Sequence, residues 1–404
     1  MTTVRTASAR AIYDSRGRPT VEIRLESAHG FVGVAGAPSG ASTGTHEVVA
    51  FPAGGVPAAL EEFRSRVAPA LIEAPLGDQA GFDARLHAVD GTPNFSRIGG
   101  NTATAASIAF ARATAASLGR ELWEVLRRPG VDGRRYPAIV GNCLNGGRHA
   151  IGGPEIQEFH AFAPEVHPED SVRVALAVHE AIGRALHERF PKHALGRGDE
   201  GGWVAPVGNL DALEILVAAC ERASGALGLE VHPGLDLAAS EFYREGRYRY
   251  REQTLDAEGQ LGFLTKLVER YDLRYLEDPF DQEDFGSFAA LTRAVGSKCL
   301  VVGDDLYATS LERLRRGVAE RSSNAVLIKV NQVGTLTDAI ATVDLARSSG
   351  LETVTSHRSG DLPDGWLAHV AVATEARGLK CGLLGGERVA KLNELLRLGR
   401  SRGA

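Results

Sequence analysis

The stretch Val326-Leu327-Ile328-Lys329-Val330 is an apolar, β-branched run that predicts a buried strand, and it contains a lysine. A charged amine in such a run is costly unless partners or chemistry stabilise it. Only six of the 45 lysine and arginine residues are lysines, so lysine is not the usual surface cation of this chain. Lys329 is therefore a candidate functional residue, although an ion pair with a core carboxylate would also explain it.

Similar short apolar runs recur on both sides of this stretch and alternate with amphipathic helical segments. The candidate strands are 138–142, 156–163, 231–237, 272–277, 299–304, 325–330, 352–357 and 378–381. The candidate helices are 169–189, 209–227, 261–270, 285–295, 310–319, 335–348, 363–376 and 386–397. The alternation predicts a parallel sheet, and about eight strands predict a closed (β/α)₈ barrel of the α/β class. The first two strands are joined by a loop too short for a crossover helix, so we expect them to be antiparallel.

The first part of the chain has a different pattern. Three β-rich segments are expected at 9–13, 20–25 and 31–35, and helices at 57–72 and 101–128. A chain of 404 residues exceeds one ordinary core, which favours two domains. We expect an N-terminal α+β capping domain over 1–130 and a catalytic barrel over 137–404.

The bulk composition excludes several classes of protein. A net charge of −6 argues against general nucleic-acid binding. No signal-peptide core or membrane-spanning apolar run is apparent, so the cytoplasm is the expected location and no membrane partner is expected. The four cysteines are widely spaced and form no C-x-x-C pair, which predicts reduced, buried thiols.

Carboxylates end three consecutive candidate strands: Asp236, Glu277 and Asp304. The carboxyl ends of barrel strands converge on one face, and that face carries the chemistry. Three hard oxygen ligands suit Mg²⁺, whereas no His/Cys set suitable for zinc accompanies them. Any one of these acids alone would be explained equally well as a helix cap or a surface residue.

The next three strands end with Lys329, with His357-Arg358-Ser359 and with Lys380. Lys329 is the candidate base, because a nearby metal, a second lysine and desolvation would each favour its neutral form. The planar guanidinium of Arg358 suits a phosphate, with a surface salt bridge as the simpler alternative. His357, taken alone, is as well explained as a hydrogen-bonded core histidine.

Two further polar segments supply candidate acid–base residues. Glu200 lies in the glycine-rich segment 198–202, and Glu158 lies in the second barrel strand. The pair suits the general acid–base work of expelling a hydroxyl. His149 lies in a glycine-flanked segment that predicts a lid loop.

These residues belong to ordered motifs that extend along nearly the whole chain. The motifs are Asp14-Ser15-Arg16-Gly17-Arg18-Pro19-Thr20-Val21-Glu22, Pro38-Ser39-Gly40-Ala41-Ser42-Thr43-Gly44, Gly198-Asp199-Glu200-Gly201-Gly202, Ala239-Ser240-Glu241-Phe242, Glu277-Asp278-Pro279-Phe280-Asp281-Gln282, Gly303-Asp304-Asp305-Leu306, Lys329-Val330-Asn331-Gln332, Ser356-His357-Arg358-Ser359-Gly360 and Glu387-Arg388-Val389-Ala390-Lys391-Leu392-Asn393. In these motifs the sequence resembles the enolase (phosphopyruvate hydratase) family. The resemblance implies a ββαα(βα)₆ barrel with an N-terminal α+β domain, and a homodimer or larger homo-oligomer.

The resemblance also implies roles for the metal ligands and the base. Asp236, Glu277 and Asp304 would hold the tighter of two Mg²⁺ ions in each active site. Ser42 would join the second ion as its loop closes. Lys329 would remove the C2 proton of 2-phosphoglycerate.

The remaining roles concern the hydroxyl, the carboxylate and the phosphate of the substrate. Glu200, supported by Glu158 and with His357 nearby, would protonate the departing C3 hydroxyl. Lys380 would help to stabilise the carboxylate of the intermediate, as both metals would. Arg358 and Ser359 would bind the phosphate, and His149 would close over it.

Three segments differ from the family pattern: 48–56, 150–156 and 381–386. They flank the expected lid and the wall beside Lys380, which indicates a diverged paralogue. The alternative substrate is therefore a phosphonate or phosphinate analogue, as in the conversion of phosphonoformyl-glycerate to carboxyphosphonoenolpyruvate in natural-product biosynthesis. A non-catalytic binding role, or an acid-sugar or muconate-type activity of the wider superfamily, would not need this complete set of residues.

Overall fold

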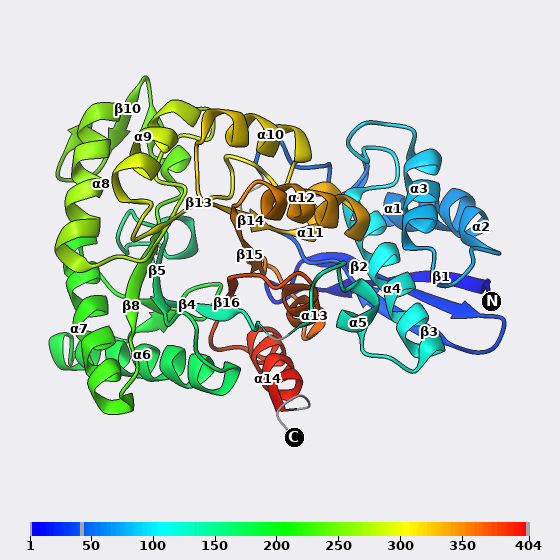
Figure 1. Cartoon of the computed structure of the whole chain (residues 1–404), viewed down its shortest axis with the longest axis horizontal. Helices are drawn as coiled ribbons and strands as arrows, with labels where there is room; N and C mark the ends of the chain where they lie inside the picture. The colour runs from blue at the N-terminus through cyan, green and yellow to red at the C-terminus, as the bar shows by residue number, and fades with distance from the viewer. Residues whose placement is uncertain (1, 41–43, 134, 401–404) are drawn as a thin grey trace.

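The structure is a computed structural model that describes residues 2–40, 44–133 and 135–400 (Figure 1). Its first three strands form an antiparallel sheet in the order β1 (Val4–Tyr13), β2 (Pro19–Ser27) and β3 (Val32–Gly36). The turn between β1 and β2 is closed by Asp14, whose carboxylate accepts two backbone hydrogen bonds at 2.9 Å. The three strands predicted in this part of the sequence are therefore confirmed: β1 and β2 are longer than predicted, and β3 is shifted by one residue.

The helices that follow differ from the prediction in two places. They are α1 (Gly55–Glu62), α2 (Ala68–Leu71), α3 (Gln79–Asp90), α4 (Gly100–Leu118) and α5 (Leu122–Leu126), with a π-helical turn, Phe63–Val67, between α1 and α2. The single helix predicted at 101–128 is wrong, because Gly119 adopts a φ of 60° that ends α4 and Glu121 starts α5 with a capping box. Helix α3 was not predicted, since two of its four buried residues are aspartates and its apolar period is weak.

The predicted (β/α)₈ barrel is confirmed. Its eight strands are β4 (Ala138–Asn145), β5 (Glu158–Phe162), β8 (His232–Asp236), β12 (Tyr275–Glu277), β13 (Leu300–Gly303), β14 (Ala325–Ile328), β15 (Glu352–Ser356) and β16 (Gly378–Gly382). Pairing of β16 with β4 closes the barrel. Strand β5 is antiparallel to both of its neighbours, β4 and β8, as the short first loop predicted. The other pairs in the barrel wall are parallel.

All eight helices predicted for this part of the chain are present. They are α6 (Pro168–Arg189), α7 (Asn209–Leu227), α8 (Ala257–Tyr271), α9 (Phe285–Val295), α10 (Leu311–Glu320), α12 (Leu336–Ser348), α13 (Trp366–Ala373) and α14 (Gly386–Arg400). A short helix, α11 (Val330–Val333), directly follows Lys329. The minor strands are β6 (Gly196–Arg197), β7 (Trp203–Val204), β9 (Tyr243–Arg244), β10 (Arg247–Arg249) and β11 (Thr254–Leu255).

The N-terminal elements lie at one side of the barrel, next to α12 and α13 (Figure 1). Helices α3 and α4 contact α12, and α5 contacts α13. A continuous apolar core extends from the N-terminal sheet to the helices around the barrel. The barrel interior has a separate small core that includes Val140, Val302, Leu327 and Val354. The site at the barrel mouth therefore lies on a rigidly packed frame.

Two predictions about the chain as a whole can be compared with the structure. Within the described residues, no helix is both long enough and apolar enough to cross a membrane. The four cysteines are buried and unpaired, as predicted. Burial raises the pKa of the Cys143 thiol to about 12, which leaves it protonated and inert at neutral pH.

Candidate active site

Ionisable side chains are placed at the carboxyl ends of six consecutive barrel strands. Asp236 and Glu277 are the last residues of β8 and β12, Asp304, Lys329 and His357 follow β13, β14 and β15, and Lys380 lies within β16. Because these strands are parallel and in register around the wall, their ends meet on one face. The apolar strand bodies fix the backbone, and only the last residues of each strand reach the mouth.

Glu158 reaches the same face from the opposite chain direction. It is the first residue of the antiparallel strand β5 and lies directly beside Asp236 in the sheet register. Its carboxylate lies 2.7 Å from His160 Nε2 and 3.3 Å from Lys380 Nζ. Because β5 is antiparallel to its neighbours, its amino-terminal end lies at the barrel mouth, so its first residue can contribute to the site.

Glu200 comes from the turn 198–202 between β6 and β7, and it is buried. This turn rests against β16, where the backbone oxygen of Glu200 lies only 2.0 Å from the position of a Cβ on Gly382. Any side chain at 382 would push the turn away from the barrel mouth. Glycine at this position therefore helps to set the position of Glu200.

The predicted site residues line one cavity at the barrel mouth. From the predicted set, its wall includes His149, Glu158, Glu200, Asp236, Asp304, Lys329, His357, Arg358, Ser359 and Lys380. Glu277 joins the group through the ammonium of Lys380, 2.7 Å from its Oε1. Ser42, the remaining predicted ligand, falls outside the described residues.

Lys380 is the central cation of the site. Its ammonium lies 2.8 Å from Asp236 Oδ2, 2.7 Å from Glu277 Oε1 and 3.3 Å from Glu158 Oε2. Burial opposes its charge, but the surrounding carboxylates raise the pKa of Lys380 well above its usual value. Lys380 is thus charged in this structure and ties three strand ends together.

Lys329 donates a hydrogen bond to Asp304 and is also charged in this structure. Burial lowers the pKa of Lys329, but the Asp304 carboxylate overcomes that effect and raises the pKa above the ordinary value. The prediction of a neutral Lys329 depended on a nearby metal, so the neutral amine stays a prediction for the metal-bound protein. Here the directly bonded Asp304 carboxylate favours the charged amine, while Lys380 and Arg358 also act on Asp304 and lower its pKa.

The candidate acid–base residues Glu200, His149 and His357 differ in their charge. Burial and Glu158 both disfavour a charge on Glu200, yet the neighbouring histidines lower the pKa of Glu200 far enough to keep it ionised. Burial opposes protonation of His149, but Glu200 and Glu158 raise the pKa of His149 to about 9. Burial lowers the pKa of His357, which is therefore neutral at pH 7. Its Nε2 lies 3.0 Å from Glu200 Oε2.

Arg358 is paired with a residue that the sequence analysis did not single out. Both terminal nitrogens of its guanidinium lie 3.0 Å from the Glu47 carboxylate, and one donates to Asn331 Oδ1 at 2.9 Å. Ser359 Oγ lies 3.5 Å from His149 Nε2. The fork of Arg358 is thus already holding an oxyanion, which is the geometry that a phosphate requires.

The carboxylates at the barrel mouth suit a divalent metal ion. Eight carboxylates line the cavity against three permanent cations, Lys329, Arg358 and Lys380. Burial and Asp236 raise the pKa of Glu277 well above its usual value, which indicates uncompensated negative charge. Asp236, Glu277 and Asp304 offer hard oxygen ligands, and the ammonium groups of Lys329 and Lys380 contact them. A second acidic group, Asp278, Asp304 and Asp305, has carboxylate oxygens within 4.8 Å of one another.

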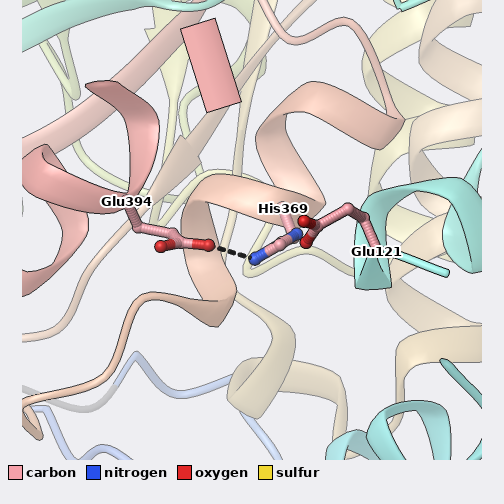
Figure 2. A group of neighbouring side chains, drawn as sticks. All are labelled: Glu121, His369 and Glu394. Atoms are coloured by element: carbon pink, nitrogen blue, oxygen red, sulfur yellow. Dashed lines mark hydrogen bonds and ion pairs between the residues drawn. The ribbon is translucent and has the colours of Figure 1, made fainter. Parts of the chain in front are cut away.

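Figure 2 shows a further His/Glu cluster, whose residues do not line the cavity. It joins Glu121 before α5, His369 on α13 and Glu394 on α14. His369 Nδ1 accepts from the Trp123 backbone, Nε2 lies 2.6 Å from Glu394, and Arg397 binds both carboxylates at 2.7–2.8 Å. These contacts already use both ring nitrogens of His369 and both carboxylates, so none of them is left free to bind a metal. The cluster instead connects the N-terminal elements to helices α13 and α14 of the barrel.

Two residues near the cavity were missed as site residues. Arg388 lies inside the last of the motifs quoted above, at the start of α14, and Glu47 lies three residues after the motif that ends at Gly44. The available signal was a charged residue in or next to a recognised motif, without an apolar strand before it. Spacing alone gave no indication that either would reach the barrel mouth.

Two family models match this chain, one in its N-terminal part and one over the barrel. Residues 4–126 match the family "Enolase, N-terminal domain", and residues 135–404 match "Enolase, C-terminal TIM barrel domain". A protein named enolase from Methanothermobacter thermautotrophicus is 45% identical over 96% of this chain and 94% of its own length. Proteins of the same name from Natronomonas pharaonis and Thermoplasma acidophilum are 43% and 41% identical over at least 96% of each chain.

The family matches cover both halves of the chain, and the relatives are similar over nearly their full length. With the closed barrel and the strand-end residues described above, they lead to one conclusion. The chain belongs to the enolase family and is an enzyme, a carbon–oxygen lyase.

Proposed function

We propose that this protein dehydrates 2-phospho-D-glycerate to phosphoenolpyruvate in a reaction that depends on two Mg²⁺ ions. One observation carries the proposal: a single acid-rich cavity holds the buried amine of Lys329, the carboxylate of Glu200 and the guanidinium of Arg358. These are the groups needed to remove a proton beside a carboxylate, to protonate a leaving hydroxyl and to bind a phosphate.

Lys329 acts as the base that takes the C2 proton. It must be neutral to do so, and its present partner is the Asp304 carboxylate. Asp236, Glu277 and Asp304 would hold one Mg²⁺, with Ser42 assigned to the second ion, and the ions would supply charge that stabilises the carboxylate of the intermediate. With Asp304 engaged as a metal ligand, Lys329 would lose the partner that raises its pKa, whereas burial, Arg358 and Lys380 lower that pKa.

Glu200 acts as the acid that protonates the C3 hydroxyl as it leaves. In the protein alone Glu200 is ionised, so it must gain a proton after the substrate enters. The negative charge of the substrate favours this change, because it counteracts the positive charge of His149. Glu158, 3.3 Å from His149 Nδ1, supports the same group.

Arg358 and Ser359 bind the phosphate, and His149 covers it. Arg358 is held by Glu47 in the structure, so the phosphate replaces the Glu47 carboxylate on the guanidinium fork.

A phosphonate or phosphinate analogue of 2-phosphoglycerate is the second candidate substrate. It is favoured by the departures at 150–156 and 381–386, two segments that border the turn carrying Glu200 and the lid residue His149. Arg358 and Ser359 would accept either phosphorus group, so the choice depends on how these two segments position His149 and Glu200, which line the cavity.

A direct assay distinguishes these candidates. The purified protein is mixed with saturating Mg²⁺ and either 2-phosphoglycerate or the phosphonate analogue, and formation of the enol-pyruvate chromophore is followed by ultraviolet absorbance. Turnover of 2-phosphoglycerate that disappears with a chelator and returns with Mg²⁺ is the expected result. No turnover of 2-phosphoglycerate, with turnover of the analogue, would replace the first candidate by the second.

A further inference from the structure

The motif Glu387-Arg388-Val389-Ala390-Lys391 at the start of α14 has no part in the function proposed above. Its two cations are almost completely buried, Arg388 at 0% and Lys391 at 1% exposure. A buried guanidinium is costly unless each of its N–H groups finds an acceptor. The partners of Arg388 therefore indicate why it is there.

Arg388 lies behind the loop that follows β15. One terminal nitrogen donates to the Nδ1 of His357 at 2.8 Å and to the backbone oxygen of Arg358 at 2.6 Å. The other donates to the backbone oxygen of Ser359 at 2.6 Å. A single side chain thus fixes three consecutive residues of the cavity wall.

The contact with His357 determines where the imidazole carries its hydrogen. A guanidinium can only donate, and it does not lose its proton in proteins. The backbone N–H of Gly382 also approaches Nδ1, at 3.3 Å. With two obligate donors facing it, Nδ1 must be the acceptor, so the hydrogen of the neutral ring is on Nε2.

The Nε2 atom faces the reaction site. His357 lines the cavity, and its Nε2 is buried 3.0 Å from Glu200 Oε2 without the alignment of a hydrogen bond. A buried donor without an aligned acceptor suggests that its acceptor is a group that enters or moves during the reaction. The departing hydroxyl and the Glu200 carboxylate are the two oxygens that meet this description.

We propose that Arg388 is a positioning residue that holds His357 as a neutral Nε2–H donor toward Glu200 and the leaving hydroxyl. This inference rests on the proposed function for the identity of the leaving group. His357 then donates a hydrogen bond and takes no proton, while Glu200 supplies the proton. Loss of Arg388 frees Nδ1 to carry the hydrogen, which leaves a lone pair at Nε2 facing the Glu200 carboxylate.

The first test reads the tautomer directly and needs no substrate. Protein labelled with ¹⁵N only in histidine is studied by long-range ¹H–¹⁵N spectra, with a His357→Gln variant to assign the His357 signals. The expected wild-type spectrum has a protonated Nε2 and an unprotonated Nδ1. A hydrogen on Nδ1 in the wild type would overturn the proposal, whether or not any Arg388 variant folds.

The second test separates positioning from a general structural role. In deuterated water, C2 exchange reports the step of Lys329, and enol-pyruvate formation reports the step of Glu200. Arg388→Met is expected to slow dehydration at saturating substrate by about 10- to 100-fold, as loss of an orienting partner does elsewhere, while C2 exchange continues. Arg388→Lys keeps an obligate donor and is expected to recover most of the dehydration rate.

Lys391→Met is the matched control. Lys391 shares the helix, the burial and the carboxylate of Asp361 with Arg388, but its hydrogen bonds go to Asp361 and to backbone oxygens rather than to His357. It is expected to leave the histidine tautomer and the ratio of exchange to dehydration unchanged. Equal loss of both steps in Arg388→Met, with an unchanged tautomer, would overturn the proposal. Absence of both steps in the wild type would instead reject the proposed substrate, while the tautomer result would still stand.

Discussion

Lys329 and Glu200 carry separate steps, and single substitutions are expected to separate them. Lys329→Ala removes the base, so it is expected to abolish both C2 proton exchange and dehydration, a loss of at least about 10²- to 10⁴-fold. Glu200→Gln removes only the acid, so exchange is expected to continue while dehydration falls by a similar factor. Exchange is measured by incorporation of deuterium at C2, and dehydration by ultraviolet absorbance.

Lys298→Ala is a suitable control for the lysine substitution, because this lysine follows α9 and is exposed. Its activity should match the wild type. If Lys329→Ala still exchanged the C2 proton, Lys329 would not be the base, and Lys380 would be the next residue to test.

The site residues that were predicted from the sequence share one property, and the site residues that were missed share another. Asp236, Asp304 and Lys329 each end an apolar run, so their position in a barrel follows from local pattern. Glu47 meets Arg358 across 311 positions of the chain, and Arg388 reaches His357 from a helix 31 residues away. Such contacts depend on how whole elements pack, which no local pattern records.

At the scale of elements, the packing of α6 against β7 gives a sharp prediction. A Cβ on Gly183 of α6 would lie 2.5 Å from the Trp203 ring, and the indole N–H donates to the backbone oxygen of His179 at 2.9 Å. Overpacking costs about 1–3 kcal/mol, against a gain of about 1 kcal/mol from replacing a helical glycine by alanine. Gly183→Ala is therefore expected to lower the free energy of unfolding by up to about 2 kcal/mol, measured by urea denaturation.

Gly262→Ala in α8 is the matched control, because no atom lies within 4 Å of the added methyl group. It is expected to stabilise the protein by up to about 1 kcal/mol through helix propensity alone. Equal stabilisation by both substitutions would show that Trp203 does not pack against α6 in this way.

The elements that were predicted well are those with a regular apolar period. Helices α7 and α9 match their predicted limits, since each buries one apolar face against the barrel. Helix α3 was not predicted because Asp83 and Asp90 are on its buried side. Asp83 is buried because it accepts hydrogen bonds from Thr337 in the barrel half, at 3.0 Å from the backbone and 2.6 Å from the hydroxyl, a partner that is invisible in the local sequence.

For the whole molecule, metal binding is expected to stabilise the barrel as one unit. Asp236, Glu277 and Asp304 come from three strands, so an ion that binds all three binds only the closed barrel. Free Mg²⁺ at 100 times its dissociation constant should raise the free energy of unfolding by about 2.7 kcal/mol. Urea denaturation with Mg²⁺ or with a chelator measures this increment.

Asp236→Asn is expected to lose most of the Mg²⁺-dependent increment, whereas Asp211→Asn should keep it. Asp211 is a half-exposed residue of α7 that pairs with Arg189 on the barrel exterior. An equal increment in both variants would place the ion elsewhere than at the three strand ends.

The joint between the two halves of the chain gives a prediction about pH. His87 on α3 lies 2.8 Å from Asp338 on α12, and this hydrogen bond raises the pKa of His87 above 6.5. A raised pKa in the folded protein stabilises it fully below the unfolded pKa, and the stabilisation is lost as pH rises through the folded pKa. Because the pair is half-exposed, its contribution is at most about 1 kcal/mol. The difference in unfolding free energy between wild type and His87→Gln should therefore be larger at about pH 6 than at about pH 9.

Asp338→Asn should return the pKa of His87, measured by NMR titration, toward 6.5. A wild-type pKa of His87 at or below 6.5 would show that this ion pair does not join the two halves in solution.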